Sequence, residues 1–295
     1  MKRVLQIAGF TLLELLIVIA VIGLLASLLL PALSRAKQKA QGIYCLNNGK
    51  QLMIAVHLYA GDYNEWLPPN PEHGTNDSWV RGSMRIPSEA TNILFLTDAR
   101  YAKLALYTKA SFNPYKCPAD KSSVVISGFR YPRVRTFSMS QAVGTKPGPS
   151  LSPVDAPWLD GKHSNRANDP WRTYGRLADM AEPAPASLWV LIDEDEHLIN
   201  DAAFAVAMTR PEQMIDWPGR YHNSSAGLAF ADGHSEVHRW RDARTSIPNN
   251  YQANPSDYLA HKVQPGNKDI IWLQERTSAK ALSLTNDQDG SGQIN

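Results

Sequence analysis

One acidic side chain stands in a long apolar stretch near the start of the chain. Glu14 is the only ionisable residue in the run GFTLLELLIVIAVIGLLASLLL, which extends from Gly9 to Leu30. A carboxylate is costly inside a membrane, so such a residue is by default a functional candidate. The alternative is a plain membrane anchor in which Glu14 lies at the interface with water.

Histidine and carboxylate side chains alternate in the C-terminal half of the chain. His234, Glu236 and His238 lie on one predicted strand, and alternate residues of a strand share one face. Both residue types are suitable zinc ligands. Three ligands from one strand cannot close a tetrahedron without a fourth, such as His222 or Asp193. The interpretation that we favour is a solvated sheet face.

Two acidic segments are candidate cation sites. The run 193–196 follows an apolar strand, and a solvated junction between strand and loop is the commoner explanation for such a run. Near the C-terminus, Asp287, Asp289 and Ser291 match the first half of an EF-hand-type loop, which stops before the acid at its twelfth position. The sequence therefore gives no firm cofactor: calcium is the candidate at this loop, and a disordered polar tail is the interpretation that we favour.

Enzymatic activity has little support in the sequence. Paired carboxylates occur in glycosidases, but nothing else in the chain favours that chemistry. The sequence contains no nucleophile elbow, P-loop, Rossmann glycine set or zinc-protease motif. A net charge of +2 in 295 residues gives no electrostatic case for binding nucleic acid. We predict that the chain is not an enzyme and has no nucleic-acid partner.

A long N-terminal helix must position Glu14. The apolar run 10–30 is long enough to cross a hydrocarbon core of about 30 Å at about 1.5 Å per residue. It follows a short basic leader, residues 1–9. Pro31 predicts a kink, after which the helix continues over residues 31–61. An apolar face of this continuation is formed by Leu52, Ala55, Val56 and Tyr59.

The N-terminal segment resembles that of type IV prepilins and type II secretion pseudopilins. The sequence Gly-Phe-Thr-Leu-Leu-Glu, from Gly9 to Glu14, matches the signature of these families at every position. The resemblance implies that a prepilin peptidase cuts after Gly9 and that the new N-terminal residue, Phe10, is N-methylated. It also implies that Glu14 meets the terminal amine of a neighbouring subunit, which would relieve the cost of its charge in lipid.

A β-hairpin is predicted over residues 222–240. Asp232-Gly233 lies between two runs of alternating apolar residues, which indicates a two-residue type I′ turn. His222 precedes Asp232 by nine intervening residues. This spacing resembles the H-x9-DG prepilin-like proteins of planctomycetes and verrucomicrobia, a resemblance that implies no particular reaction. We expect His222 to cap the hairpin by bonding to a backbone group or to Asp232, in a structural element without catalytic function.

The chain has two cysteines, Cys45 and Cys117. The head of a pilin-like protein faces an oxidising compartment, where a lone pair of cysteines tends to form a disulfide. Such a bridge would pin the helix to the head and close a loop of about 70 residues, worth about 4 kcal/mol on the chain-entropy model. Two buried free thiols are the alternative.

The predicted fold is α+β and pilin-like: a long N-terminal membrane helix packed on a head, residues 62–295, that contains an antiparallel β-sheet. With 20 Pro and 18 Gly the chain is rich in loops. The segment 144–179 is predicted to be a long insertion with little regular structure.

The predicted function is a structural subunit of a type II secretion or type IV pilus-like filament. Its expected location is the inner membrane, crossed once, with the head in the periplasm. The expected partners are the prepilin peptidase, which also methylates, and other pilin-like subunits. The alternative is a monomeric membrane-anchored periplasmic binding protein or hydrolase, in which Trp158 and Trp171 of the insertion would contact a ligand.

Overall fold

The structure is a computed structural model that describes residues 11–71, 77–247, 251 and 261–281. The chain divides into two compact units, residues 1–41 and residues 42–295. The predicted leader, residues 1–9, lies outside the described residues.

The helix α1 (Leu12–Asp62) is the longest element, with 51 residues. It confirms the predicted N-terminal helix and stays helical through Pro31. The apolar side chains of its first half are exposed, and by length and composition this is the one described helix that could cross a membrane. Within the second unit, one face of α1 is buried, at residues spaced three and four apart: Cys45, Asn48, Gly49, Leu52, Met53, Ala55, Val56, Tyr59 and Ala60.

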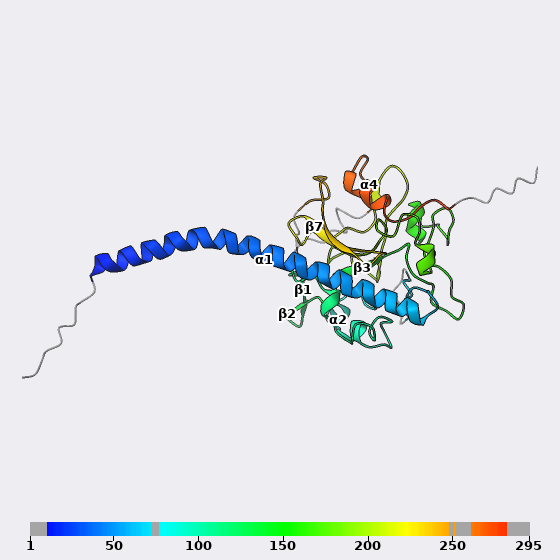
Figure 1. Cartoon of the computed structure of the whole chain (residues 1–295), viewed down its shortest axis with the longest axis horizontal. Coiled ribbons are helices and arrows are strands. Elements are labelled where there is room, and N and C mark those ends of the chain that lie inside the picture. The colour runs from blue at the N-terminus through cyan, green and yellow to red at the C-terminus, as the bar shows by residue number, and fades with distance from the viewer. Residues whose placement is uncertain (1–10, 72–76, 248–250, 252–260, 282–295) are drawn as a thin grey trace, which may run out of the picture. The chain divides into compact units, whose positions relative to one another are not determined.

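A five-stranded mixed sheet forms the centre of the head, in the strand order β5-β3-β4-β7-β8 (Figure 1). Adjacent strands are antiparallel except β3 and β5, which are parallel. The prediction of an antiparallel sheet is thus right for four of the five strands. The strands are β3 (Phe137–Ser140), β4 (Trp189–Asp193), β5 (Ala203–Phe204), β7 (Ser225–Phe230) and β8 (Ser235–Arg239).

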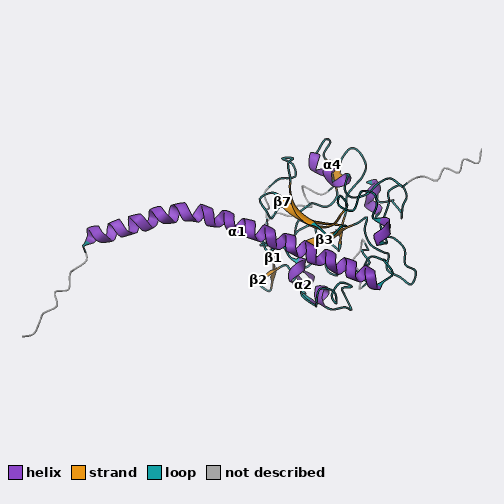
Figure 2. Ribbon diagram, viewed as in Figure 1, coloured by secondary structure: helices purple, strands orange, loops and turns teal. Residues whose placement is uncertain are grey.

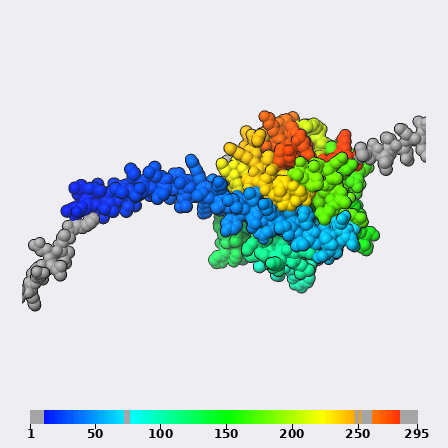
Figure 3. All heavy atoms as spheres, in the orientation of Figure 1, coloured from blue at the N-terminus to red at the C-terminus, as the bar shows by residue number. Residues whose placement is uncertain are grey.

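The two faces of this sheet are covered by different elements. On one face, Val190, Leu191 and Ala229 join the core that includes the buried residues of α1. On the other face, Trp189, Ile192 and Phe230 pack with Leu273 of the short helix α4 (Lys268–Gln274). In the space-filling view the second half of α1 lies against the yellow β7–β8 segment (Figure 3). The central strands β4 and β7 are consequently buried along their whole length.

The remaining elements are short and joined by long irregular segments (Figure 2). The insertion 144–179 contains 3-10 turns and isolated bridges, as its composition predicted. The other described elements are α2 (Pro87–Ala90), α3 (Leu94–Thr97), β1 (Ser123–Ile126), β2 (Phe129–Pro132), β6 (Gln213–Met214), β9 (Lys262–Val263) and 3-10 helices at 113–115, 157–160 and 177–179.

Candidate functional site

Glu14 forms a reciprocal cap at the start of α1. Its Oε2 atom accepts hydrogen bonds from the backbone N–H and the hydroxyl of Thr11, both at 2.8 Å. In return the N–H of Glu14 donates to Thr11 Oγ1 at 3.2 Å. This is a capping box, in which the side chains of a Thr and of a Glu three residues later satisfy free N–H groups at a helix start. This second role of Glu14 was not predicted, although the sequence pattern Thr-x-x-Glu could have revealed it.

The described hairpin differs from the predicted one at its turn. Strands β7 and β8 pair in register from Ser225 with Arg239 to Ala229 with Ser235. The N–H of Gly233 donates to Phe230 O, and Phe230 N donates to His234 O, so three residues form the loop instead of two. Only Gly233 has a positive φ, at 91°, which suits a type I turn followed by a glycine bulge. The predicted type I′ turn at Asp232-Gly233 is therefore wrong, although the hairpin itself is confirmed.

A histidine of α1 contacts the backbone of the hairpin loop. The Nε2 atom of His57 lies 2.9 Å from the carbonyl oxygen of Ala231 in the loop. A polar residue on an otherwise apolar helix face was the only hint of this contact in the sequence. The hairpin thus docks on α1 through its loop as well as through its strands.

His222 does not cap the hairpin as predicted. Its Nε2 atom lies 3.1 Å from Cys117 Sγ and 4.0 Å from Asp193 Oδ2. The turn residue Asp232 bonds instead to His234, with 2.6 Å between Oδ1 and Nδ1. Burial lowers the pKa of His222 to about 4, so the ring is neutral at physiological pH. The imidazole therefore belongs to a buried cluster on the α1 side of the sheet.

The two cysteines are free thiols, and the predicted disulfide is absent from the structure. Cys45 donates its S–H to Asp193 Oδ2 at 3.0 Å, whereas Cys117 contacts His222. Each thiol thus has a polar partner of its own, and the two thiols also interact with each other. Their sulfur atoms and the ligand atoms of Asp193 and His222 all lie within 4.8 Å of one another. The prediction that these cysteines meet between helix and head is correct, and the covalent bond is not.

Asp193 is the centre of this cluster. It ends β4 and is fully buried, and its Oδ1 accepts from the hydroxyl of Thr136 at 3.1 Å. Its Oδ2 accepts from the N–H of Gly227 at 3.0 Å as well as from Cys45. Burial raises the pKa of Asp193 to about 7 and also raises the pKa of the Cys117 thiol. The pKa of the Cys45 thiol is raised by its hydrogen bond with Cys117 and by burial.

The acidic run after β4 is buried, which contradicts the predicted solvated junction. Residues 193–196 are each at most 2% exposed. The carboxylate of Asp195 forms a salt bridge with Arg220, also buried, and Glu196 accepts from the hydroxyl of Tyr221 at 3.0 Å. Burial and the charge of Asp195 raise the pKa of Glu196 to about 7. The run packs against residues 217–222 and so helps to position His222.

The predicted metal ligands on β8 are not gathered into a site. The ring of His234 stacks on Phe230, with 4.3 Å between ring centroids. His238 stacks on Trp272 of α4 at 3.7 Å and lies 3.7 Å from Glu236. The side chains of His234 and Glu236 are 40% and 43% exposed, whereas that of His238 is 15% exposed beneath Trp272, so the expectation of a solvated face is right only in part.

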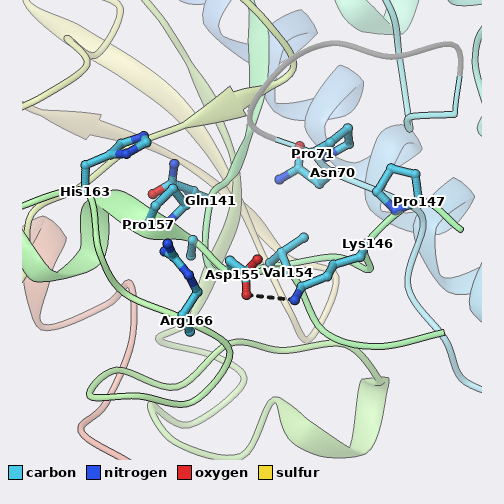
Figure 4. A pocket seen from close by; sticks show the side chains of 11 residues that line it. Asn70, Pro71, Gln141, Lys146, Pro147, Val154, Asp155, Pro157, His163 and Arg166 are labelled. Carbon is cyan, nitrogen blue, oxygen red and sulfur yellow. Dashed lines mark ion pairs between the residues drawn. The ribbon is translucent and has the colours of Figure 1, made fainter. Parts of the chain in front are cut away.

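The insertion lines a cavity of about 440 Å³ in the described residues of the head. In Figure 4, Lys146 reaches across to Asp155, at 2.8 Å, while His163 and Arg166 lie on another side. Trp158 stands in a neighbouring cavity, and its ring centroid is 4.7 Å from that of His163. Trp171 packs against the core, so the two tryptophans do not form one surface.

Several predicted residues lie outside the described ranges of the chain. These are Gly9 and Phe10, at the expected cleavage and methylation site, and the calcium candidates Asp287, Asp289 and Ser291. Their functions remain predictions.

Two comparisons with known proteins found similarity to this chain. Residues 6–30 match the prokaryotic N-terminal methylation motif. The chain is also 28% identical, over 133 residues, to the type II secretion system core protein G of Pectobacterium carotovorum subsp. carotovorum, in a match that covers 39% of this chain and 81% of that protein. No solved structure matches the chain. The chain is thus a prepilin- or pseudopilin-like protein with a helix that fits a single-pass membrane anchor, and both matches point to a structural subunit.

Proposed function

We propose that the chain is a structural subunit of a type II secretion or type IV pilus-like filament. It enters the inner membrane as a precursor with its head in the periplasm. A prepilin peptidase cuts it after Gly9 and methylates Phe10, and α1 then packs against the helices of other pilin-like subunits. One observation carries the proposal: the methylation motif at residues 6–30 includes the start of α1, and the apolar first half of this helix contains a single acidic residue, Glu14.

The geometry of Glu14 is compatible with both of its proposed roles. In the single chain only Oε2 accepts from Thr11, among the hydrogen bonds of the described residues. A carboxylate offers about four lone-pair sites on its two oxygens. The terminal amine of a neighbouring subunit can therefore bond to Oε1 while Oε2 keeps the cap. In lipid such a pair would remove an otherwise uncompensated charge.

Processing and assembly can be tested separately in cells that contain an active prepilin peptidase. Gly9→Val should leave full-length precursor in the membrane, because the small residue before the cleaved bond is lost. Glu14→Gln should be cut and inserted normally but should not enter filaments, since glutamine keeps the cap and removes the charge. Mass spectrometry of the N-terminus and recovery of sheared filaments measure the two steps.

Thr11→Val is the matched control for Glu14→Gln. It removes the hydroxyl of the capping box and leaves the carboxylate, so we expect it to assemble. Normal assembly of Glu14→Gln would refute the proposed pairing between subunits. An intact Met1 on the wild-type membrane protein would refute the processing step and with it the central claim.

Crosslinking separates a filament subunit from a monomeric anchored binding protein. A single cysteine introduced by Leu16→Cys, on the exposed half of α1, should form disulfide-linked dimers in the membrane if helices pack together. A binding protein that uses the cavity of the insertion would stay monomeric in the membrane and in detergent. Absence of such dimers in cells that produce filaments would favour that second function.

A further inference from the structure

Four potential metal ligands converge between α1 and the sheet of the head. Cys45 comes from α1, Cys117 from the segment after the 3-10 helix 113–115, and Asp193 from the end of β4. His222 comes from the segment before β7. The ligand atoms of all four lie within 4.8 Å of one another. This cluster is distinct from the N-terminal residues that the proposed function uses.

We propose that Cys45, Cys117, Asp193 and His222 bind one zinc ion in a closed structural site. Two thiolates, one imidazole and one carboxylate form a ligand set that suits Zn²⁺, which prefers four ligands in a tetrahedron. Zinc–sulfur bonds of about 2.3 Å and zinc–nitrogen or zinc–oxygen bonds of about 2.0–2.1 Å give tetrahedron edges of about 3.3–3.8 Å. The separations of 3.0 Å, 3.1 Å and 4.0 Å between ligand atoms fall close to these edges.

The orientation of the His222 ring supports the assignment of a metal to this site. The side chain of His222 is 6% exposed, and its Nδ1 has no hydrogen-bond partner among the described residues. Its Nε2 faces the two sulfurs and the carboxylate. In this orientation Nε2 is the ring nitrogen that can bind a metal together with the other three side chains.

Neighbouring groups hold the carboxylate and one cysteine in position. The Thr136 hydroxyl donates to Asp193 Oδ1, and Thr136 Oγ1 accepts from the backbone N–H of Cys117 at 2.7 Å. The N–H of Gly227 donates to Asp193 Oδ2. Hydrogen bonds of this kind orient the ligands of a metal and belong to its site.

Gly227 of β7 has no side chain, and this leaves room for two of the ligands. A Cβ atom on Gly227 would lie 2.6 Å from Cys45 Sγ and 3.0 Å from Asp193 Oδ2. Any side chain at this position would displace two of the four ligands. The glycine on β7 therefore lets the strand pass directly beside the cluster.

Zinc binding releases protons from the groups that bind the ion. Zn²⁺ replaces the protons of both thiols and the proton of Asp193 where that carboxyl is protonated, and these protons pass to solvent. Two thiolates, one carboxylate and a neutral imidazole give the occupied site one net negative charge. The carboxylate of Asp193, once ionised, keeps the hydrogen bonds from Thr136 and Gly227. A disulfide between the cysteines is the competing chemistry, because it would consume the same two sulfurs.

Metal content of the full chain, purified in detergent without chelator and incubated with Zn²⁺, is the direct test. We expect one zinc per chain after removal of unbound metal, measured by inductively coupled plasma mass spectrometry. Cys117→Ser and His222→Ala should each lower the bound zinc at least tenfold. His234→Ala is the matched control, since this histidine lies in the hairpin turn, and it should keep full zinc content.

A second measurement uses only the wild-type chain, so its result does not depend on whether the variants fold. Treatment of the wild-type chain with a strong chelator should lower its melting temperature, and Zn²⁺ but not Mg²⁺ should restore it. Co²⁺ bound in place of zinc should show the visible bands of a tetrahedral site and a thiolate charge-transfer band.

Three results would overturn the proposal. They are a wild-type chain that retains no zinc, a melting temperature that the chelator leaves unchanged, and an intact mass that is two hydrogens lighter because the cysteines are bridged. None of these results bears on filament assembly, so the failure of this proposal is distinguishable from the failure of the proposed function.

Discussion

The buried salt bridge between Asp195 and Arg220 provides a quantitative test of how the acidic run is held in the head. Both side chains are 2% exposed. A second guanidinium N–H of Arg220 donates to Ile247 O at 2.9 Å, and the N–H of Asp195 donates to Trp217 O at 2.8 Å. These bonds join the end of β4 to the segment that leads into β7.

Arg220→Met keeps much of the volume of the side chain and removes its charge. The substitution leaves the carboxylate of Asp195 buried without its cation, and removal of one partner of a buried pair costs about 3–5 kcal/mol. For a domain of about 150–250 residues each kcal/mol lowers the melting temperature by roughly 2–4 °C. We therefore expect a decrease of roughly 6–20 °C.

A double-mutant cycle shows whether this loss comes from the pair itself. In the background of Asp195→Asn, which is neutral, Arg220→Met should cost less by more than about 0.5 kcal/mol, the usual limit of additivity for independent sites. Thermal unfolding of the full chain in detergent, followed by tryptophan fluorescence, measures all four proteins. Arg100→Met is the control, because it breaks the exposed pair with Asp98 and should leave the melting temperature unchanged. Equal costs of Arg220→Met in both backgrounds would refute the argument.

Two further predictions concern the hairpin and the acidic run. Gly233→Val should lower stability by about 1–3 kcal/mol in thermal unfolding, because a β-branched residue is strained at the φ of 91°, and Gly233→Asn should cost less. Glu196 has a pKa of about 7 in the folded chain, above the value of about 4.3 expected when unfolded, so the protonated group stabilises the fold at low pH and this contribution is lost as the pH rises toward 7. Glu196→Gln should therefore raise stability at about pH 8, by on the order of 3 kcal/mol at most, and leave it unchanged at about pH 4; the same gain at both pH values would contradict the assignment.

The helix and the hairpin could be predicted because each is specified by the spacing of apolar residues within one short stretch of sequence. The spacing of Leu52, Ala55, Val56 and Tyr59 identifies the buried face of α1, and all four are buried. The alternation around Asp232-Gly233 identifies β7 and β8. The predicted turn type is wrong because the turn depends on register: Ala231 joins Asp232 and Gly233 in the loop only when Ala229 pairs with Ser235.

Burial of the acidic run could not be predicted, because its partners come from elsewhere in the chain. Four successive acidic residues are usually exposed, since an unpaired buried carboxylate is costly. Here Arg220 and Tyr221 supply the missing partners from a segment more than twenty residues later. The local composition gives no sign of this pairing.

The sequence indicates a role for each residue of the proposed zinc site, but in two separate hypotheses. Cys45 and Cys117 are predicted to form a disulfide, and Asp193 and His222 are candidate fourth ligands for a site on β8. Their distances depend on how α1 docks on the sheet, which no local pattern reveals. In the structure the two cysteines lie beside Asp193 and His222. Gly227 makes this possible because it has no side chain between Cys45 and Asp193.

Zinc at this position would connect the helix to the head of a filament subunit. Of the four ligands, Cys45 alone lies on α1, and the other three come from the head beyond the helix. A metal that binds the folded chain and not the unfolded one adds its binding free energy to stability. Here that free energy would act on the junction between the second half of α1 and the sheet. Pairing of Glu14 with a neighbouring subunit involves the opposite end of the same helix, so assembly and attachment of the head can fail independently. Loss of Cys117 should thus loosen the head of a subunit whose helix is still processed and inserted.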